Sequence, residues 1–330
     1  MSHLRVNREA GRASLCAAAR PEPAPPSARR LVAEAQFEYN GRMPELPDLE
    51  VIREFLAPRI IGVEIVAAAV RRPIVVRNLL GGDAADHLVG RQFVDVTRRG
   101  KYLLLPLDNG STLLINPMLA GRIRYGHPLS RHRVRDALVL LLADGQELRY
   151  HDAKDMGKVY LVADLDQVPG FPTLGPEATD PELTLDLFRQ RLRRHPGEIK
   201  GVLTNQSFVV GIGNAYADEI LWRAGLYPFR RRASLSDEEV ARLYAATRAV
   251  LAEAIETLRT RVGADIDVEV RDLLSVHGKA GQRCPRCGST ISQVTRQRQA
   301  THFCRTCQPG LMVGGLTTKD TKEHERRERA

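Results

Sequence analysis

Near its C-terminal end the chain carries two Cys-x-x-Cys pairs, in the stretch CPRCGSTISQVTRQRQATHFCRTC, with 16 residues between the pairs. This spacing is typical of a zinc site with four thiolate ligands, because each pair forms a tight knuckle and the intervening residues can form a hairpin. Four cysteines fill the coordination shell, so the ion would be structural and would supply folding energy to a segment too small to fold alone. The predicted ligands of one zinc ion are Cys284, Cys287, Cys304 and Cys307.

Redox chemistry or disulfide bonding is the alternative use of paired cysteines. Residues 1–20 lack the continuous apolar run of a secretory signal, so we expect a reducing cytoplasm, where disulfides are rare. No apolar run approaches the roughly 20 residues that a membrane-spanning helix needs, and we expect no membrane partner.

The charge balance is basic, with 49 Lys and Arg residues against 40 Asp and Glu residues. The excess persists when residues 1–42 are set aside, so it belongs to the rest of the chain. A basic excess indicates an anionic partner such as nucleic acid, although simple solubility charge explains it equally well. In the cysteine segment, Arg296 and Arg298 lie near the expected hairpin tip, where they would suit contact with phosphates.

Residues 44–165 predict a largely antiparallel β domain that begins with its one helix. Leu49, Ile52, Leu56 and Ile60 recur at helical spacing, and alternating apolar runs follow them. Two Asn-Gly or Asp-Gly pairs between such runs, at 109–110 and 144–145, are typical of hairpin turns.

A turn-rich linker separates this part from a helical one. Four helices are predicted there, at Leu183–Arg194, Ile199–Leu203, Asp218–Ala224 and Ser236–Arg259. We divide the chain into a disordered extension (1–42), the β domain (43–170), the helical domain (171–272), the cysteine segment (273–310) and a charged tail (311–330).

Two further motifs stand out. In GIGNAYADEILWRAGLYP, two glycines permit a tight turn and Asn214 precedes a helix, so the free N–H groups at the helix start could seat a phosphate. The residues alone favour a plain packing joint between helices at this turn. In MPELPDLE, Glu45 and Asp48 read as carboxylates that cap a helix.

Together, and in this order, the MPELP stretch, the β domain, GIGNAYADE and the four-cysteine hairpin ending in CRTCQ resemble the formamidopyrimidine-DNA glycosylase / endonuclease VIII family. The resemblance covers about residues 43–310. It implies an α+β multidomain fold with an N-terminal antiparallel β-sandwich, a helix–two-turn–helix domain and a C-terminal zinc hairpin. It also implies a monomeric bacterial repair enzyme, associated with the nucleoid, that acts on double-stranded DNA carrying oxidised bases or abasic sites.

The family's chemistry gives the MPELP stretch a role. By resemblance, Pro44 is an N-terminal nucleophile that displaces the damaged base, forms a Schiff base and leads to β/δ-elimination of the strand. Glu45 corresponds to the acid/base that helps to open the sugar, and Lys101 to a lysine that assists elimination. Without the resemblance, Lys101 reads as a surface charge at a strand edge.

Pro44 can react only as a free amine, because the lone pair of an amide nitrogen is delocalised. In the 330-residue chain Pro44 follows Met43, so this chain should not react by that route. We expect either that translation starts at Met43, which we favour, or that the first 43 residues are removed.

The DNA-binding positions follow the family only in part. Asn214 would seat a phosphate, and Lys200 matches another basic position. In the two strand-insertion loops, NPMLAG places Leu119 at the wedge and DAKDMG places Lys154 where the family has an arginine. These changes leave oxidised purines and oxidised pyrimidines open as substrates.

In the hairpin, Gln299 stands at the position of the family's phosphate-binding arginine, and Arg298 next to it would point the other way on a strand. This departure motivates an alternative, a catalytically inactive DNA-binding protein with the same fold. An unrelated zinc-ribbon module is a third reading, which the GIGNAYADE motif disfavours.

Overall fold

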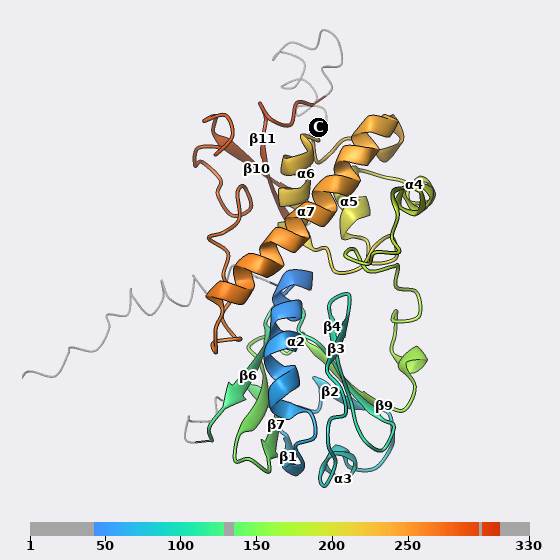
Figure 1. Ribbon diagram of the computed structural model, residues 1–330, viewed down its shortest axis with the longest axis vertical. Helices are drawn as coiled ribbons and strands as arrows, with labels where there is room; N and C mark the ends of the chain where they lie inside the picture. The colour runs from blue at the N-terminus through green and yellow to red at the C-terminus, as the bar shows by residue number, and fades with distance from the viewer. Residues whose placement is uncertain (1–42, 129–134, 297–298, 311–330) are drawn as a thin grey trace, which may run out of the picture. The chain divides into compact units, whose positions relative to one another are not determined.

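A computed structural model describes residues 43–128, 135–296 and 299–310. The predicted extension and charged tail, and Arg298 at the hairpin tip, lie outside the described residues. The α+β fold expected from the sequence is confirmed: a β-sheet domain is followed by helices and then by a β-hairpin with the four cysteines (Figure 1).

The β domain is a sandwich of two sheets that share one apolar core. Side chains from both sheets, such as Leu113 and Leu140, are fully buried in this core. One sheet has the order β1-β7-β8-β6 and the other β2-β9-β5-β4-β3, antiparallel except for the pairing of β2 with β9. The strands are β1 (Ile65–Val70), β2 (Val76–Asn78), β3 (Thr97–Arg99), β4 (Tyr102–Pro106), β5 (Thr112–Asn116), β6 (Gly121–Gly126), β7 (Asp136–Leu142), β8 (Glu147–Asp152) and β9 (Lys158–Val162).

Both predicted hairpin turns are confirmed. Gly110 joins β4 to β5 and Gly145 joins β7 to β8, each with a positive φ of 83° and 81° that glycine adopts without strain. The expectation of a single helix in this domain was wrong. A second short helix, α3 (Ala84–Leu88), follows Asp83, whose carboxylate accepts a hydrogen bond from Ala85 N.

The first helix of the domain, α2 (Leu46–Ile60), buries its apolar face in the sandwich core and also packs against α7 (Figure 1). Arg259 of α7 forms an ion pair with Glu54 of α2 at 2.6 Å. The β domain and the helical part therefore meet along these two helices.

The helical part contains the four predicted helices. Ser236 and Glu239 form a capping box at the start of α7, and Gly225 ends α6 in the left-handed conformation. None of the helices in the described part of the chain is both long and apolar enough to cross a membrane. The elements are α4 (Leu185–Arg194), α5 (Ile199–Thr204), α6 (Asn214–Ala224) and α7 (Asp237–Arg261), followed by the hairpin strands β10 (Ile291–Arg296) and β11 (Gln299–Cys304).

Candidate active site and metal centre

Pro44 lies buried at the start of α2 and lines a recess. The recess runs between β6 and the segment that follows α7, with Ile52, Arg122 and Glu269 among its other lining residues. Arg122 and Glu269 form an ion pair at 3.0 Å there. A charged pair beside an apolar wall is able to orient a flat, polar ring.

Glu45 is turned toward α6. Its carboxylate accepts hydrogen bonds from the backbone N–H groups of Gly213 at 2.6 Å and Ala215 at 2.9 Å, and a longer one from Tyr216 at 3.3 Å. These are the groups that the sequence offered as a phosphate seat, so the seat is occupied by a carboxylate of the same chain. The turn therefore packs against the start of α2, and phosphate binding by Asn214 stays a prediction.

The predicted capping function at α2 is divided between the two carboxylates. Asp48 accepts the backbone N–H of Glu45 at 2.8 Å, as an N3 residue of a capping box does. Arg271 clamps the same Asp48 with two hydrogen bonds of 2.9 Å and donates to the carbonyl of Met43 at 3.2 Å. The start of α2 is thereby held from both sides.

Lys101 meets Glu45 at Gly213. A Cβ atom on Gly213 would lie 2.4 Å from the Glu45 carboxyl carbon and 2.7 Å from the Lys101 ammonium nitrogen, so only glycine leaves room for both. The Lys101 nitrogen also lies 3.8 Å from the Met43 sulfur. Burial lowers the pKa of Lys101, and the neighbouring Glu45 charge opposes that shift.

Asn214 and Lys200 both reach the cysteine hairpin. The Asn214 amide donates to the carbonyl of Ala300 at 2.9 Å, and the Lys200 ammonium donates to the same carbonyl at 3.2 Å and to the Thr301 hydroxyl at 2.8 Å. Lys200 is only 6% exposed and is paired with Asp218 at 2.7 Å. It therefore reaches the hairpin from the protein interior rather than from an open surface.

The two candidate strand-insertion loops lie side by side. The loop with Leu119 joins β5 to β6 and the loop with Lys154 joins β8 to β9, and their flanking residues pair as Asn116 with Lys158 and Gly121 with Asp152. Leu119 is half-buried and Lys154 is exposed. Pro117 and Gly121 of the first loop also line the recess beside Pro44.

At the hairpin tip, Gln299 is exposed and pairs directly with Arg296 across the two strands. Side chains of directly paired residues lie on the same face of an antiparallel ladder. The Arg296 guanidinium stacks 4.5 Å from the Phe229 ring centroid and pairs with Glu198 at 3.2 Å. Arg296 is therefore the described basic side chain on the face of Gln299.

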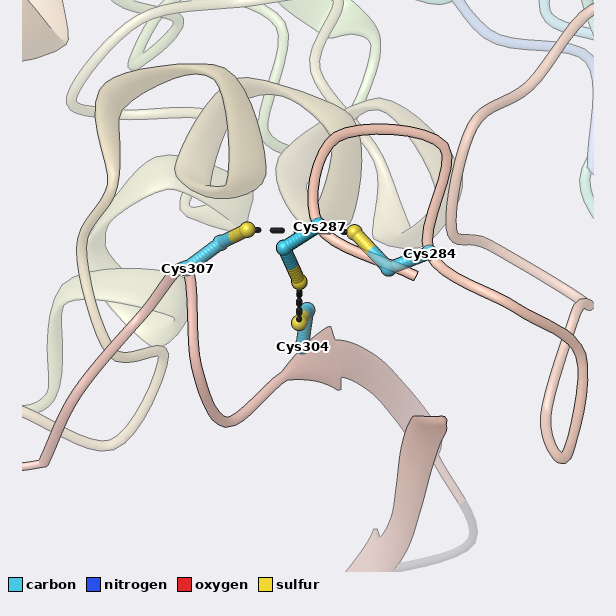
Figure 2. A group of neighbouring side chains, drawn as sticks. All are labelled: Cys284, Cys287, Cys304 and Cys307. Carbon is cyan, nitrogen blue, oxygen red and sulfur yellow. Dashed lines mark hydrogen bonds between the residues drawn. The ribbon is translucent and has the colours of Figure 1, made fainter. Parts of the chain in front are cut away.

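The four cysteines converge as predicted. Figure 2 shows their sulfur atoms pointing toward one another, with Cys284 and Cys307 3.8 Å apart and Cys287 and Cys304 3.4 Å apart. All four sulfurs lie within 4.8 Å of one another. A tetrahedral ion with bonds of about 2.3 Å separates its ligands by roughly 3.8 Å, so the thiol set fits such an ion.

The roles of two residues in this site were not predicted from the sequence. Arg271 lies in the segment between the helical part and the cysteines, where no periodicity distinguishes it. Gly213 was noted for turn flexibility, yet its φ is an ordinary −118° and its role is to give way to two side chains. Only the three-dimensional arrangement reveals either function.

Comparisons with known proteins agree with this arrangement. Residues 43–159 match the model of the formamidopyrimidine-DNA glycosylase N-terminal domain, and residues 174–264 match that of the H2TH domain of the same enzyme. Curated relatives named formamidopyrimidine-DNA glycosylase include those of Heliobacterium modesticaldum, 40% identical over 81% of this chain and 100% of the relative, and of Symbiobacterium thermophilum, 37% identical over 81% and 90%.

Solved structures give the same answer. The Lactococcus lactis enzyme in complex with DNA containing an abasic site has a TM-score of 0.73 and 30% identity, covering 81% of this chain and all of that chain. A structure of MutM with DNA containing carbocyclic 8-oxo-G has the same TM-score, identity and coverage. The chain belongs to the formamidopyrimidine-DNA glycosylase family.

Proposed function

We propose that this protein removes oxidised bases from double-stranded DNA and then cleaves the strand as an abasic-site lyase. The observation that carries the proposal is the meeting of Glu45 and Lys101 at Gly213, next to Pro44. A nucleophile with an acid/base and a cation beside it is the arrangement that a covalent glycosylase needs. The DNA bound in the structures of its relatives supports the partner.

In the proposed reaction, the free amine of Pro44 attacks C1′ of the damaged nucleotide and the bond from C1′ to the base breaks. Glu45 donates a proton to the ring oxygen as the sugar opens and the Schiff base forms. The Schiff base acidifies the neighbouring C–H bond, and loss of that proton leads to elimination of the phosphates. Lys101 assists these eliminations. The recess beside Pro44, with its Arg122–Glu269 pair, would receive the displaced base.

The residues before Pro44 decide whether this chemistry can begin. Met43 acylates the Pro44 nitrogen, and its sulfur lies against the Lys101 ammonium group. Removal of Met43 would therefore free the nucleophile and uncover the cation together. We propose that the reactive form starts at Pro44, whether by a start at Met43 or by removal of a longer leader.

We infer further that the cysteine cluster holds one structural zinc ion. Hydrogen bonds from Ser289 lower the pKa of Cys287 to about 6, whereas burial raises the pKa of Cys307 to about 12. Zinc binds thiolates, so loading the site would release protons at neutral pH. The ion would hold the hairpin together, and the reaction would take place elsewhere in the protein.

A catalytically inactive DNA-binding role is the second candidate. The observation that favours it is Gln299, which leaves the hairpin tip without a cationic side chain at that position. Under this alternative, duplex DNA would bind without forming any covalent intermediate.

Borohydride trapping on DNA with an abasic site separates the two candidates. The 330-residue chain and a chain that begins at Met43 are each incubated with the duplex and borohydride, and any cross-link is mapped by mass spectrometry. We expect a cross-link at Pro44 in the shorter chain only. Absence of any cross-link from both chains, with DNA still bound, would establish the non-catalytic candidate instead.

A further inference from the structure

A buried carboxylate joins three separate parts of the chain. Asp218 of α6 is fully buried, and one of its oxygens pairs with the Lys200 ammonium group of α5 at 2.7 Å. The other oxygen accepts a hydrogen bond from the His277 ring at 2.8 Å and one from the His302 backbone N–H at 3.0 Å. His277 belongs to the segment before the cysteines, and His302 belongs to β11.

This cluster is a polar junction rather than a second metal site. The ligand atoms of Asp218, His277 and His302 lie within 4.8 Å of one another, as metal ligands do. However, the Lys200 ammonium group already neutralises the carboxylate, and a divalent cation would have to sit beside it. Burial raises the pKa of Asp218, but hydrogen bonds from both histidines and the Lys200 charge outweigh it, so the pKa lies below its usual value. The carboxylate is therefore ionised, and the ring nitrogens donate to it.

The junction grips β11 close to the hairpin tip. Three successive residues, Ala300, Thr301 and His302, are held by Lys200, Asn214 or Asp218. The next residue toward the tip is Gln299. The His302 ring also reaches Gln293 of β10 at 3.1 Å, so both strands are tied to the junction.

The cysteines alone cannot fix the tip. Cys304 ends β11 and Gln299 begins it, and a strand rises about 3.3 Å per residue, which places the tip roughly 17 Å from the cluster. A two-stranded ribbon of that length is marginally stable by itself and twists freely. Contacts at residues 300–302 restrict this freedom, as does the stacking of Arg296 on Phe229.

We propose that Asp218 is a positioning residue that, with Lys200, locks the cysteine hairpin onto the helical domain so that both grip the same stretch of DNA. The proposal rests on the proposed function, because it assumes that the hairpin tip contacts DNA. It assigns Lys200 to this lock as the ammonium group that bridges Asp218 and β11.

The direction in which DNA affinity changes on Asp218→Asn distinguishes the proposal from a simple charge effect. Replacing Asp218 by asparagine makes the protein more basic, and a more basic protein binds DNA more tightly when charge alone decides. The lock predicts the opposite. Glu253 of α7 offers the matched control, because its carboxylate is exposed and pairs only with Arg223 among the described residues, so Glu253→Gln removes the same charge without touching the hairpin.

The experiment compares the unaltered protein with Asp218→Asn, Asp218→Asn/Lys200→Met and Glu253→Gln. The double variant is included because a lone buried ammonium group could prevent folding, whereas removing both charges avoids that problem. Affinity for a duplex with a stable abasic-site analogue, zinc content and amide hydrogen exchange of residues 300–302 are measured on the 330-residue chain. The single-turnover rate at saturating DNA is measured on the form that cross-links.

We expect both Asp218 variants to weaken DNA binding by about tenfold or more, the size of one lost charge-assisted contact, and to exchange faster at residues 300–302. Zinc content should stay unchanged in the double variant, and Glu253→Gln should keep its zinc and its rate at saturating DNA and bind as tightly as the unaltered protein or more so. A double variant that keeps its affinity would overturn the proposal. Equal loss of zinc and rate would also overturn it, because the residue would then be purely structural.

Failure of the proposed function gives a different result. If the unaltered protein neither binds the abasic duplex nor cross-links in either form, the DNA-repair function itself is wrong. If it binds and cross-links while the Asp218 variants match it, only the lock is wrong.

Discussion

In the β-sandwich, side chains from both sheets and from α2 form one continuous apolar core. The cysteine hairpin packs in smaller groups: one apolar cluster with Trp222 of α6 and Val276, and the ring of Phe303 against Tyr227 and Phe229. The sandwich is stabilised by hydrophobic burial distributed over many residues. The hairpin has less apolar burial and relies in addition on the four thiols at one end and on the Asp218 junction near the other. A single substitution should therefore lower the stability of the sandwich only in part, whereas a single substitution at a key contact of the hairpin should disrupt the whole hairpin.

The largest effect is expected from Cys284→Ser. Loss of one thiolate should abolish zinc binding, and structural zinc supplies on the order of 10 kcal/mol or more of folding energy in small domains. We expect DNA affinity to fall by roughly a hundredfold or more while the sandwich keeps its thermal transition. Zinc analysis, calorimetry and DNA titration check this, with Cys16→Ser as the control. Zinc-free protein that still bound DNA with normal affinity would show that DNA binding does not depend on the zinc-bound hairpin.

In the sandwich, Leu113→Ala should cost about 2–5 kcal/mol of stability, because Leu113 is fully buried in β5, the central strand of its sheet, and its removal leaves a cavity. Zinc content should not change. Val94, which is 54% exposed, offers a control whose change to Ala should shift stability by only about 0.5 kcal/mol. Denaturant titration measures both. Loss of zinc from the Leu113 variant would show that the two regions do not fold independently.

The sequence predicted local features well and long-range ones poorly. The turns at Gly110 and Gly145 and the helix predicted from Ser236 depend on neighbouring residues, so their patterns are readable. Helix α6 begins at Asn214, four residues before the predicted start at Asp218. The reason is tertiary: its first N–H groups are capped by Glu45, 168 residues away from Gly213, which no local pattern indicates.

The site shows the same division. The cysteine cluster was predictable because ligand spacing encodes it. The Arg296–Gln299 pairing depends on the register of the hairpin, which fixes which basic residue shares a face with which. The family resemblance named Pro44, Glu45 and Lys101, and their chemistry stays a prediction until a cross-link is mapped.

Gly213→Ala tests whether the joint between the β domain and α6 aligns the reacting groups. The added Cβ would collide with the Glu45 carboxylate and the Lys101 ammonium group, and neither can withdraw without losing a contact. A displacement of about 1 Å can cost a hundredfold in rate, so we expect roughly that loss in single-turnover cleavage, with DNA affinity nearly unchanged. Gly201→Ala is the matched control, because a Cβ there meets open space. Equal rates for the two variants would contradict this role.

The smallest effect is expected at the hairpin tip. Arg296→Ala removes the described basic side chain that shares a face with Gln299, so DNA affinity should fall by up to about tenfold and the salt slope should decrease by about one. Gln299→Arg should do the reverse, because it adds a guanidinium group to the same face. Arg242→Ala controls for net charge, because it removes one positive charge from an exposed position on α7. The ion pair of Arg242 with Glu239 is long, at 3.9 Å. If Arg296→Ala and Arg242→Ala weaken binding equally, the tip contributes charge alone, and the hairpin is a support for the helical domain rather than a DNA contact.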